Sequence, residues 1–100
     1  MAITPEGRVK AQIKAYLNSI GAYWFMPVQT GYGTSTVDFL VCYRGYFIAI
    51  EAKAPGKMPT KFQELTMEKI RKAGGKVYVV HDMEELIGIA GFNPQPEVPV

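Results

Sequence analysis

The sequence predicts an α/β domain in which a sheet of four strands is covered by helices on both faces. Segments with helical periodicity and short β-prone segments follow one another in the order α-β-β-β-α-β-α. The two central β-prone segments are apolar on both faces, so each face needs a covering layer. The chain has 100 residues, 48% of them hydrophobic and 20% charged, which predicts a single folded domain over residues 1–100.

The first helix is expected to begin at Thr4 and Pro5, because Thr caps a first turn and Pro suits the first helical position. Apolar residues then recur at three- and four-residue steps until Gly21, which predicts one buried helix face consisting of Val9, Ile13, Tyr16, Leu17 and Ile20. Residues 22–28 are expected to form the first strand, and residues 29–36 a loop rich in glycine and hydroxyl groups.

Residues 37–43 and 46–53 flank Arg44-Gly45 and predict a hairpin. An even-length turn at this position pairs residues whose numbers sum to 89, which sets Asp38 opposite Glu51 on one face. Two carboxylates held this close repel each other unless a cation lies between them or one is protonated. Because side chains alternate along a strand, Lys53 shares the face of Glu51.

The second half of the chain predicts a helix, a strand and a short helix. Thr60 and Gln63 have the spacing of a capping box, which begins a helix that ends near residue 73, before a glycine pair. Residues 76–81 are β-prone, and Asp82 caps a short helix that ends near residue 90. Residues 92–100 contain three prolines and are expected to form an extended tail.

Composition excludes several classes of protein. No apolar run approaches the roughly 18–20 residues that cross a bilayer, and the first residues lack the layout of a secretory signal, so a cytoplasmic location without membrane contact is expected. Cys42 is the only cysteine, which excludes an intrachain disulfide and a thiolate cluster and predicts a buried, unreactive thiol. The net charge is only +2, but bases gather between residues 53 and 76, as either a polyanion-binding surface or a solvated helix face.

Asp38, Glu51 and Lys53 form the candidate chemical centre. Carboxylate ligands without His or Cys select Mg²⁺ or Mn²⁺ over Zn²⁺, and Mg²⁺ suits phosphate chemistry. Lys53 would orient or deprotonate a water, or stabilise charge in the transition state. The alternative interpretation is a surface ion-pair group at the edge of the sheet.

Three further polar residues each have two interpretations. Glu6 extends the buried stripe of the first helix, either to complement the helix dipole or to join the site. Gln63 faces the core side of its helix and suits a cap or a site contact. His81, next to Asp82, is expected to make a structural hydrogen bond rather than to act in catalysis.

These motifs together resemble the VRR-NUC branch of the PD-(D/E)XK nuclease superfamily, over roughly residues 4–81. The resemblance rests on an acidic residue opening the first helix, a Gly-rich loop before the aspartate, a short hairpin, the strand IAIEAKAP and a Thr-x-x-Gln helix start. Val37 departs from the motif, which usually has Pro at this position, but the position carries no ligand.

The resemblance implies a restriction-endonuclease-like core with a mixed sheet and an Mg²⁺- or Mn²⁺-dependent DNA endonuclease. It implies that Asp38, Glu51 and the Ala52 carbonyl bind the metal. Glu6 would lie near the metal, directly or through water. Lys53 would be the catalytic lysine, and Gln63 would support the site.

Stand-alone relatives of this size are typically bacterial or phage homodimers that act on branched DNA, including four-way (Holliday) junctions. The resemblance therefore implies a homodimer, branched DNA as substrate and no small-molecule cofactor. The alternative is a non-catalytic nucleic-acid-binding or assembly module that keeps the nuclease fold. A sequence-specific restriction nuclease is disfavoured by the small size and by the absence of an evident base-reading insertion.

Overall fold

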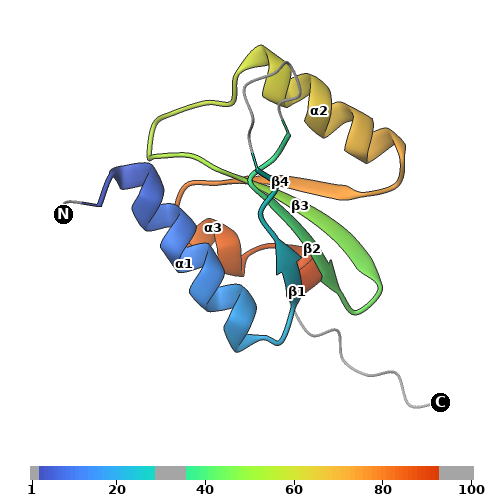
Figure 1. Cartoon of the computed structure of the whole chain (residues 1–100), viewed down its shortest axis with the longest axis horizontal. Helices are drawn as coiled ribbons and strands as arrows, with labels where there is room; N and C mark the ends of the chain where they lie inside the picture. The colour runs from blue at the N-terminus through green and yellow to red at the C-terminus, as the bar shows by residue number, and fades with distance from the viewer. Residues whose placement is uncertain (1–2, 29–35, 93–100) are drawn as a thin grey trace.

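A computed structural model describes residues 3–28 and 36–92 of the chain (Figure 1). Its elements confirm the order predicted from the sequence and add one 3-10 turn, η1. They are α1 (Pro5–Ser19), β1 (Tyr23–Phe25), β2 (Phe39–Tyr43), β3 (Tyr46–Ala52), α2 (Lys61–Lys72), β4 (Lys76–Val80), α3 (Met83–Ile87) and η1 (Ala90–Phe92). Within these described ranges, no helix has the length and apolar character needed to cross a membrane.

The four strands form one mixed sheet in the order β1-β2-β3-β4. β1 and β3 are both antiparallel to β2, whereas β3 and β4 run parallel and are joined through α2. The predicted hairpin register is confirmed from Tyr43↔Tyr46 to Phe39↔Ile50. Arg44 and Gly45 have φ values of 50° and 84°, which is the left-handed conformation that a tight two-residue hairpin requires. The turn therefore fixes the register.

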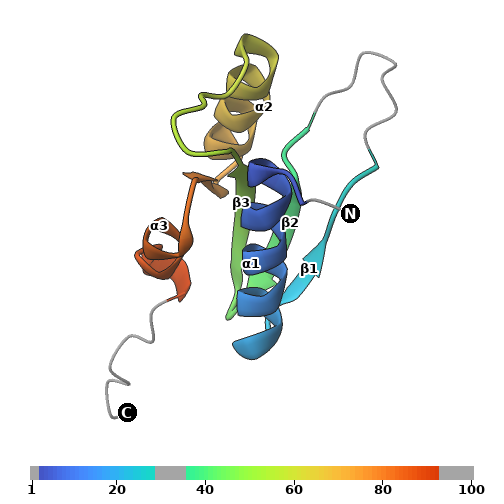
Figure 2. The ribbon, with the colours of Figure 1, turned by 90° about the vertical axis from the view of Figure 1, so that its left-hand side faces the viewer.

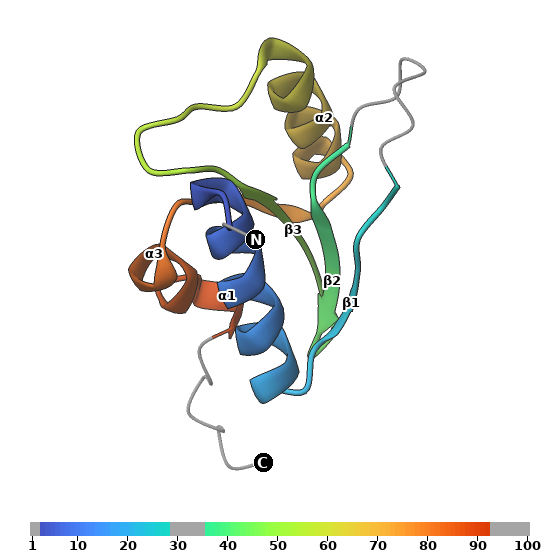
Figure 3. The ribbon, with the colours of Figure 1, turned by 60° about the vertical axis from the view of Figure 1, so that its left-hand side comes forward.

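Helices cover both faces of the sheet, as the apolar pattern predicts (Figures 2 and 3). On one face, Ile13 and Leu17 of α1 and Leu86 of α3 are fully buried against β2 and β3. On the other face, Met67 of α2 packs against Ala49 in a smaller core. The larger core holds the sheet and α1 together, and the smaller core, which also includes Val37 and Val77, holds α2 against the sheet.

Both long helices begin and end at the signals seen in the sequence. The Thr4 side chain accepts a hydrogen bond from the Gly7 amide at 3.0 Å and caps α1. The capping box predicted for α2 is present in full, and Gly74 follows its end with a φ of 98°. The Gly75 amide then donates to the Ile70 carbonyl, which closes the turn into β4.

Three expectations differ from the structure. β1 covers three residues and is shorter than the expected 22–28. Cys42 is exposed rather than buried, because α2 covers only part of its sheet face and leaves the hairpin end open. Phe92 belongs to η1 rather than to an extended tail, and its ring is 2% exposed with edge contacts to Tyr16 and Tyr43. Residues 29–35 of the predicted loop and residues 93–100 of the predicted tail lie outside the described residues.

The burial of Phe92 predicts that Phe92→Ala destabilises the fold by about 3–5 kcal/mol, because the change removes a ring from the larger core and leaves a cavity. Phe62→Ala is the matched control, since this ring is 74% exposed and its loss should change stability by less than about 0.5 kcal/mol. Urea unfolding followed by circular dichroism measures both. Equal midpoints for the two variants would show that Phe92 is outside the core.

Candidate active site

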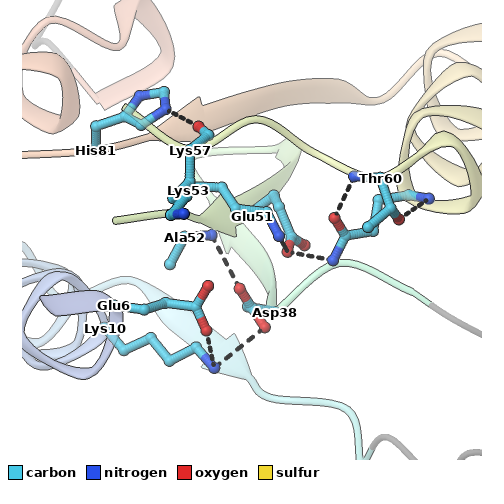
Figure 4. Close-up of polar contacts among 10 residues, drawn as sticks. Glu6, Lys10, Asp38, Glu51, Ala52, Lys53, Lys57, Thr60 and His81 are labelled. Carbon is cyan, nitrogen blue, oxygen red and sulfur yellow. Dashed lines mark hydrogen bonds and ion pairs between the residues drawn. The ribbon is translucent and has the colours of Figure 1, made fainter. Parts of the chain in front are cut away.

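Polar side chains from α1, α2 and the hairpin meet at the end of the sheet where β2 begins and β3 finishes (Figure 4). Asp38 directly precedes β2, Glu51 and Ala52 end β3, and Lys53 follows. The first turns of α1 and α2 approach this end of the sheet. The sequence-predicted residues that the structure brings together here are Glu6, Asp38, Glu51, Ala52, Lys53 and Gln63.

Glu51 lies at the centre of this group and is only 2% exposed. Its Oε1 accepts a hydrogen bond from Gln63 Nε2 at 2.8 Å and lies 3.8 Å from Lys53 Nζ. The expectation that Lys53 shares the face of Glu51 is thereby confirmed. Glu51 Oε2 is buried and has no hydrogen-bond partner among the residues that the structure describes. A buried carboxylate oxygen without a partner is costly, so this atom is the natural point for a proton or a cation.

The surroundings of Glu51 raise its pKa to about 8. Burial is the largest cause, because it removes water from the charged form, and the nearby Asp38 carboxylate adds repulsion. The ammonium group of Lys53 opposes both effects but does not outweigh them. Near neutral pH and without a metal, the Glu51 carboxyl group is therefore largely protonated. Because Oε1 already accepts from Gln63, the proton belongs on Oε2.

Asp38 differs from the simple opposed pair that the hairpin arithmetic predicts. The ladder ends at Phe39↔Ile50, and Asp38 forms a bend just before β2. Its Oδ2 accepts a hydrogen bond from the Ala52 amide at 2.9 Å. Its Oδ1 lies 3.5 Å from Lys10 Nζ. The carboxylate thus closes the end of the sheet and remains close enough to Glu51 to raise its pKa.

Lys10 belongs to the group although the sequence analysis did not identify it. Its ammonium group lies 3.4 Å from Glu6 Oε2 as well as 3.5 Å from Asp38 Oδ1. Partial burial opposes its charge, but the two carboxylates outweigh this effect and raise the pKa of Lys10. The available signal was its spacing, four residues after Glu6 on the stripe that contains Val9. Glu6 itself is half-exposed and is linked to Asp38 through this lysine.

Gln63 both caps α2 and contacts the candidate site, the two roles expected from its position in the sequence. Its Oε1 accepts a hydrogen bond from the Thr60 amide at 2.8 Å, and its own amide donates to Thr60 Oγ1 at 3.2 Å. The same side chain donates from Nε2 to Glu51. The cap of α2 therefore orients the amide that holds the buried carboxyl group.

His81 makes structural hydrogen bonds, as expected from the sequence. Its Nε2 donates to the Lys57 carbonyl at 2.8 Å, and its Nδ1 lies 3.1 Å from both carboxylate oxygens of Glu85. The partner is Glu85 rather than the adjacent Asp82. These bonds raise the pKa of His81 and tie the loop after Lys53 to α3.

The donor set fits a hard divalent cation that keeps several of its waters. Among the described residues, no three His, Cys, Asp or Glu side chains converge on one point, so the carboxylates of Asp38 and Glu51 are the main candidates. The unpartnered Glu51 Oε2 is the observation that favours a ligand at this place. The N–H and C=O of a strand residue point to one side of the strand, so the Ala52 carbonyl also faces the Asp38 side.

Comparison with solved structures identifies a protein of similar fold. No protein-family model and no curated protein matches the sequence. A solved structure described as a "VRR_NUC domain" matches with a TM-score of 0.72 and 27% sequence identity. The match covers 84% of this chain and 91% of that one. The two folds therefore correspond over most of this chain.

The raised pKa of Glu51 predicts an unusual dependence of stability on pH. The folded state keeps a proton on Glu51 up to about pH 8, whereas the unfolded chain releases it near its ordinary value of 4.5. Without divalent metal, the free energy of unfolding should therefore fall as pH rises between these values, by a few kcal/mol. Urea unfolding in EDTA at several pH values measures the slope.

Glu51→Gln is the control, because it keeps the side chain's size and removes its titration. His81 also has a raised pKa, and its stabilising contribution is likewise lost as pH rises, so only the difference between wild type and variant isolates Glu51. The variant should lose most of the slope. Identical slopes for wild type and Glu51→Gln would show that the carboxyl group is not protonated in the folded state.

Proposed function

Because the structural match supports the assignment of this chain to the VRR-NUC family, we propose that the protein is an endonuclease that hydrolyses phosphodiester bonds in DNA. The observation that carries the proposal is the buried Glu51 carboxyl group, with one unpartnered oxygen, beside Asp38 and Lys53. A structural role alone does not account for a carboxyl group held almost out of water and against a like charge.

Nuclease folds of this kind generally use divalent metal ions, and Mg²⁺ or Mn²⁺ is the ion proposed here. Asp38 and Glu51 would hold it, with the Ala52 carbonyl as an additional ligand and Glu6 nearby, directly or through water. A bound ion of this type supplies charge stabilisation at a phosphoryl oxygen and a lower pKa for a bound water.

Lys53 is proposed as the catalytic lysine. Its side chain is 13% exposed and its ammonium group lies 3.8 Å from Glu51 Oε1. From this position it can orient the attacking water, accept its proton or stabilise negative charge on the phosphorus centre in the transition state. Gln63 is a positioning residue, since it fixes the Glu51 oxygen that faces Lys53.

Branched DNA, including four-way junctions, is the proposed substrate, and a homodimer is the proposed assembly. A two-fold dimer places two identical centres so that each can cut one strand of a junction. The competing function is a non-catalytic nucleic-acid-binding or assembly module, which would need neither the buried carboxyl group nor its lysine. Metal-independent binding without cleavage of any substrate would favour that module.

Cleavage assays test the proposal directly. Labelled four-way junction, flap and linear duplex are incubated with Mg²⁺, Mn²⁺ or EDTA, and cleavage is expected only with metal. Lys53→Ala should lower the cleavage rate by about 10²–10⁴-fold, the usual contribution of a positioned acid–base group, with DNA binding nearly unchanged.

Lys14→Ala removes the same charge from an exposed position on α1 and is the matched control. Its cleavage rate should stay within about twofold of wild type, as expected for a surface substitution. If Lys53→Ala retains the turnover of Lys14→Ala, Lys53 has no place in the mechanism.

A further inference from the structure

An exposed apolar stripe leads away from the candidate site along the outer side of α2. Phe62 and Leu65 are 74% and 56% exposed, and Met58, in the loop before the helix, is 73% exposed. Phe62 and Leu65 are three residues apart and so lie on neighbouring positions of one helix face. Met67, which points inward, packs against the sheet, so the stripe is not needed to hold α2 in place.

Residues of the stripe are close in sequence to residues of the candidate site. Phe62 immediately precedes Gln63, whose amide is hydrogen-bonded to Glu51 at 2.8 Å. Met58 lies in the short loop that joins Lys53 to α2, and this loop is held by the bond between His81 and the Lys57 carbonyl (Figure 4). The capping box fixes the first turn of α2, so the direction of Phe62 relative to Glu51 is also fixed.

The charge around the stripe suits a polyanion. Exposed bases flank it in the loop and on the helix, namely Lys57, Lys61, Lys69 and Lys72. Glu64 and Glu68 are the acidic residues within α2, so bases outnumber acids here. Large apolar side chains between lysines are typical of surfaces on which unpaired bases stack while the lysines contact phosphates.

We propose that the Phe62 stripe binds unpaired bases of the DNA substrate next to the cleaved bond, with Phe62 as the stacking residue. This inference rests on the proposed nuclease function and supplies a reason for structure selectivity. A fully paired duplex offers no unpaired base to Phe62, whereas a gap or a flap does. Leu65, three residues further along the helix, would extend the apolar contact surface.

Binding measurements in EDTA separate this contribution from cleavage. Fluorescence anisotropy compares a paired duplex with a gapped duplex of the same sequence. Phe62→Ala should weaken binding of the gapped DNA by roughly 5- to 150-fold, the range that loss of one base–aromatic stack produces. Binding of the paired duplex should change by less than about twofold, as for a contact that only unpaired bases make. Phe62→Trp should restore the preference, because the indole ring also stacks.

Two controls isolate stacking from other effects. Tyr46→Ala removes an aromatic ring that is 45% exposed at the hairpin turn, the other end of β3 from Glu51, and should leave both affinities unchanged. A 2-aminopurine base placed opposite the gap should lose fluorescence on binding wild type or Phe62→Trp, and keep it with Phe62→Ala. Light scattering of each variant shows whether the stripe instead joins two copies of the chain.

Several outcomes overturn the inference. Equal loss of gapped and paired DNA binding in Phe62→Ala would show that the ring contributes no base contact. A dimer that becomes monomeric in this variant would assign the stripe to a second copy of the chain. Wild type that cuts paired and gapped DNA equally would remove the inference but leave the proposed nuclease intact, whereas wild type that neither binds nor cuts any DNA would remove both.

Discussion

Burying the Glu51 carboxyl group at the end of β3 has a free-energy cost, because its charged form loses contact with water. The groups around Glu51 can be understood from the need to offset this cost. Burial disfavours its charge, the Asp38 carboxylate disfavours it further, and Lys53 offsets only part of the cost. One oxygen is held by Gln63 and the other has no partner in the described part of the chain. The group therefore exists either as a neutral acid or as the ligand of a cation.

The surroundings of Glu51 come from three separate elements of the fold. The hairpin turn sets the register that brings Glu51 and Asp38 to one end of the sheet. The cap of α2 directs Gln63 to Glu51, and α1 supplies Lys10 as the counterion of Asp38. Because each contribution depends on a different packing contact, the centre forms only when the larger and smaller cores are both assembled. Folding and formation of the site are thus coupled.

The parts of this arrangement that could be predicted from the sequence are those with local signals. The two-residue turn at Arg44-Gly45 and the Thr60–Gln63 capping box are encoded within a few residues, so register and helix start followed directly. The resemblance to a known nuclease family then predicted the mixed sheet, which the structure confirms, and the candidate site residues.

What the sequence did not reveal depends on packing between distant segments. In the sequence, Lys10 looks like an ordinary surface lysine. Its role depends on the packing of α1, which brings its ammonium group close to Asp38. Phe92 follows the short helix and precedes a proline-rich stretch, and only the space between Tyr16 and Tyr43 explains its burial. Cys42 lies in an apolar run but on the part of the face that α2 leaves open. The placements of Phe92 and Cys42 have no local signature, and the four-residue spacing of Lys10 from Glu6 does not by itself indicate the contact with Asp38.

The central claim is that the neutral Glu51 carboxyl group gives up its proton to bind a divalent cation. Calorimetric titration with Mn²⁺ near pH 7, repeated in buffers of different ionisation enthalpy, counts the protons released per ion bound. We expect about one proton for wild type, because a metal ligand must be deprotonated and Glu51 titrates near pH 8. The Glu51→Gln variant should show weak binding and no release. Tight binding by wild type without proton release, or no binding at all, would contradict the claim.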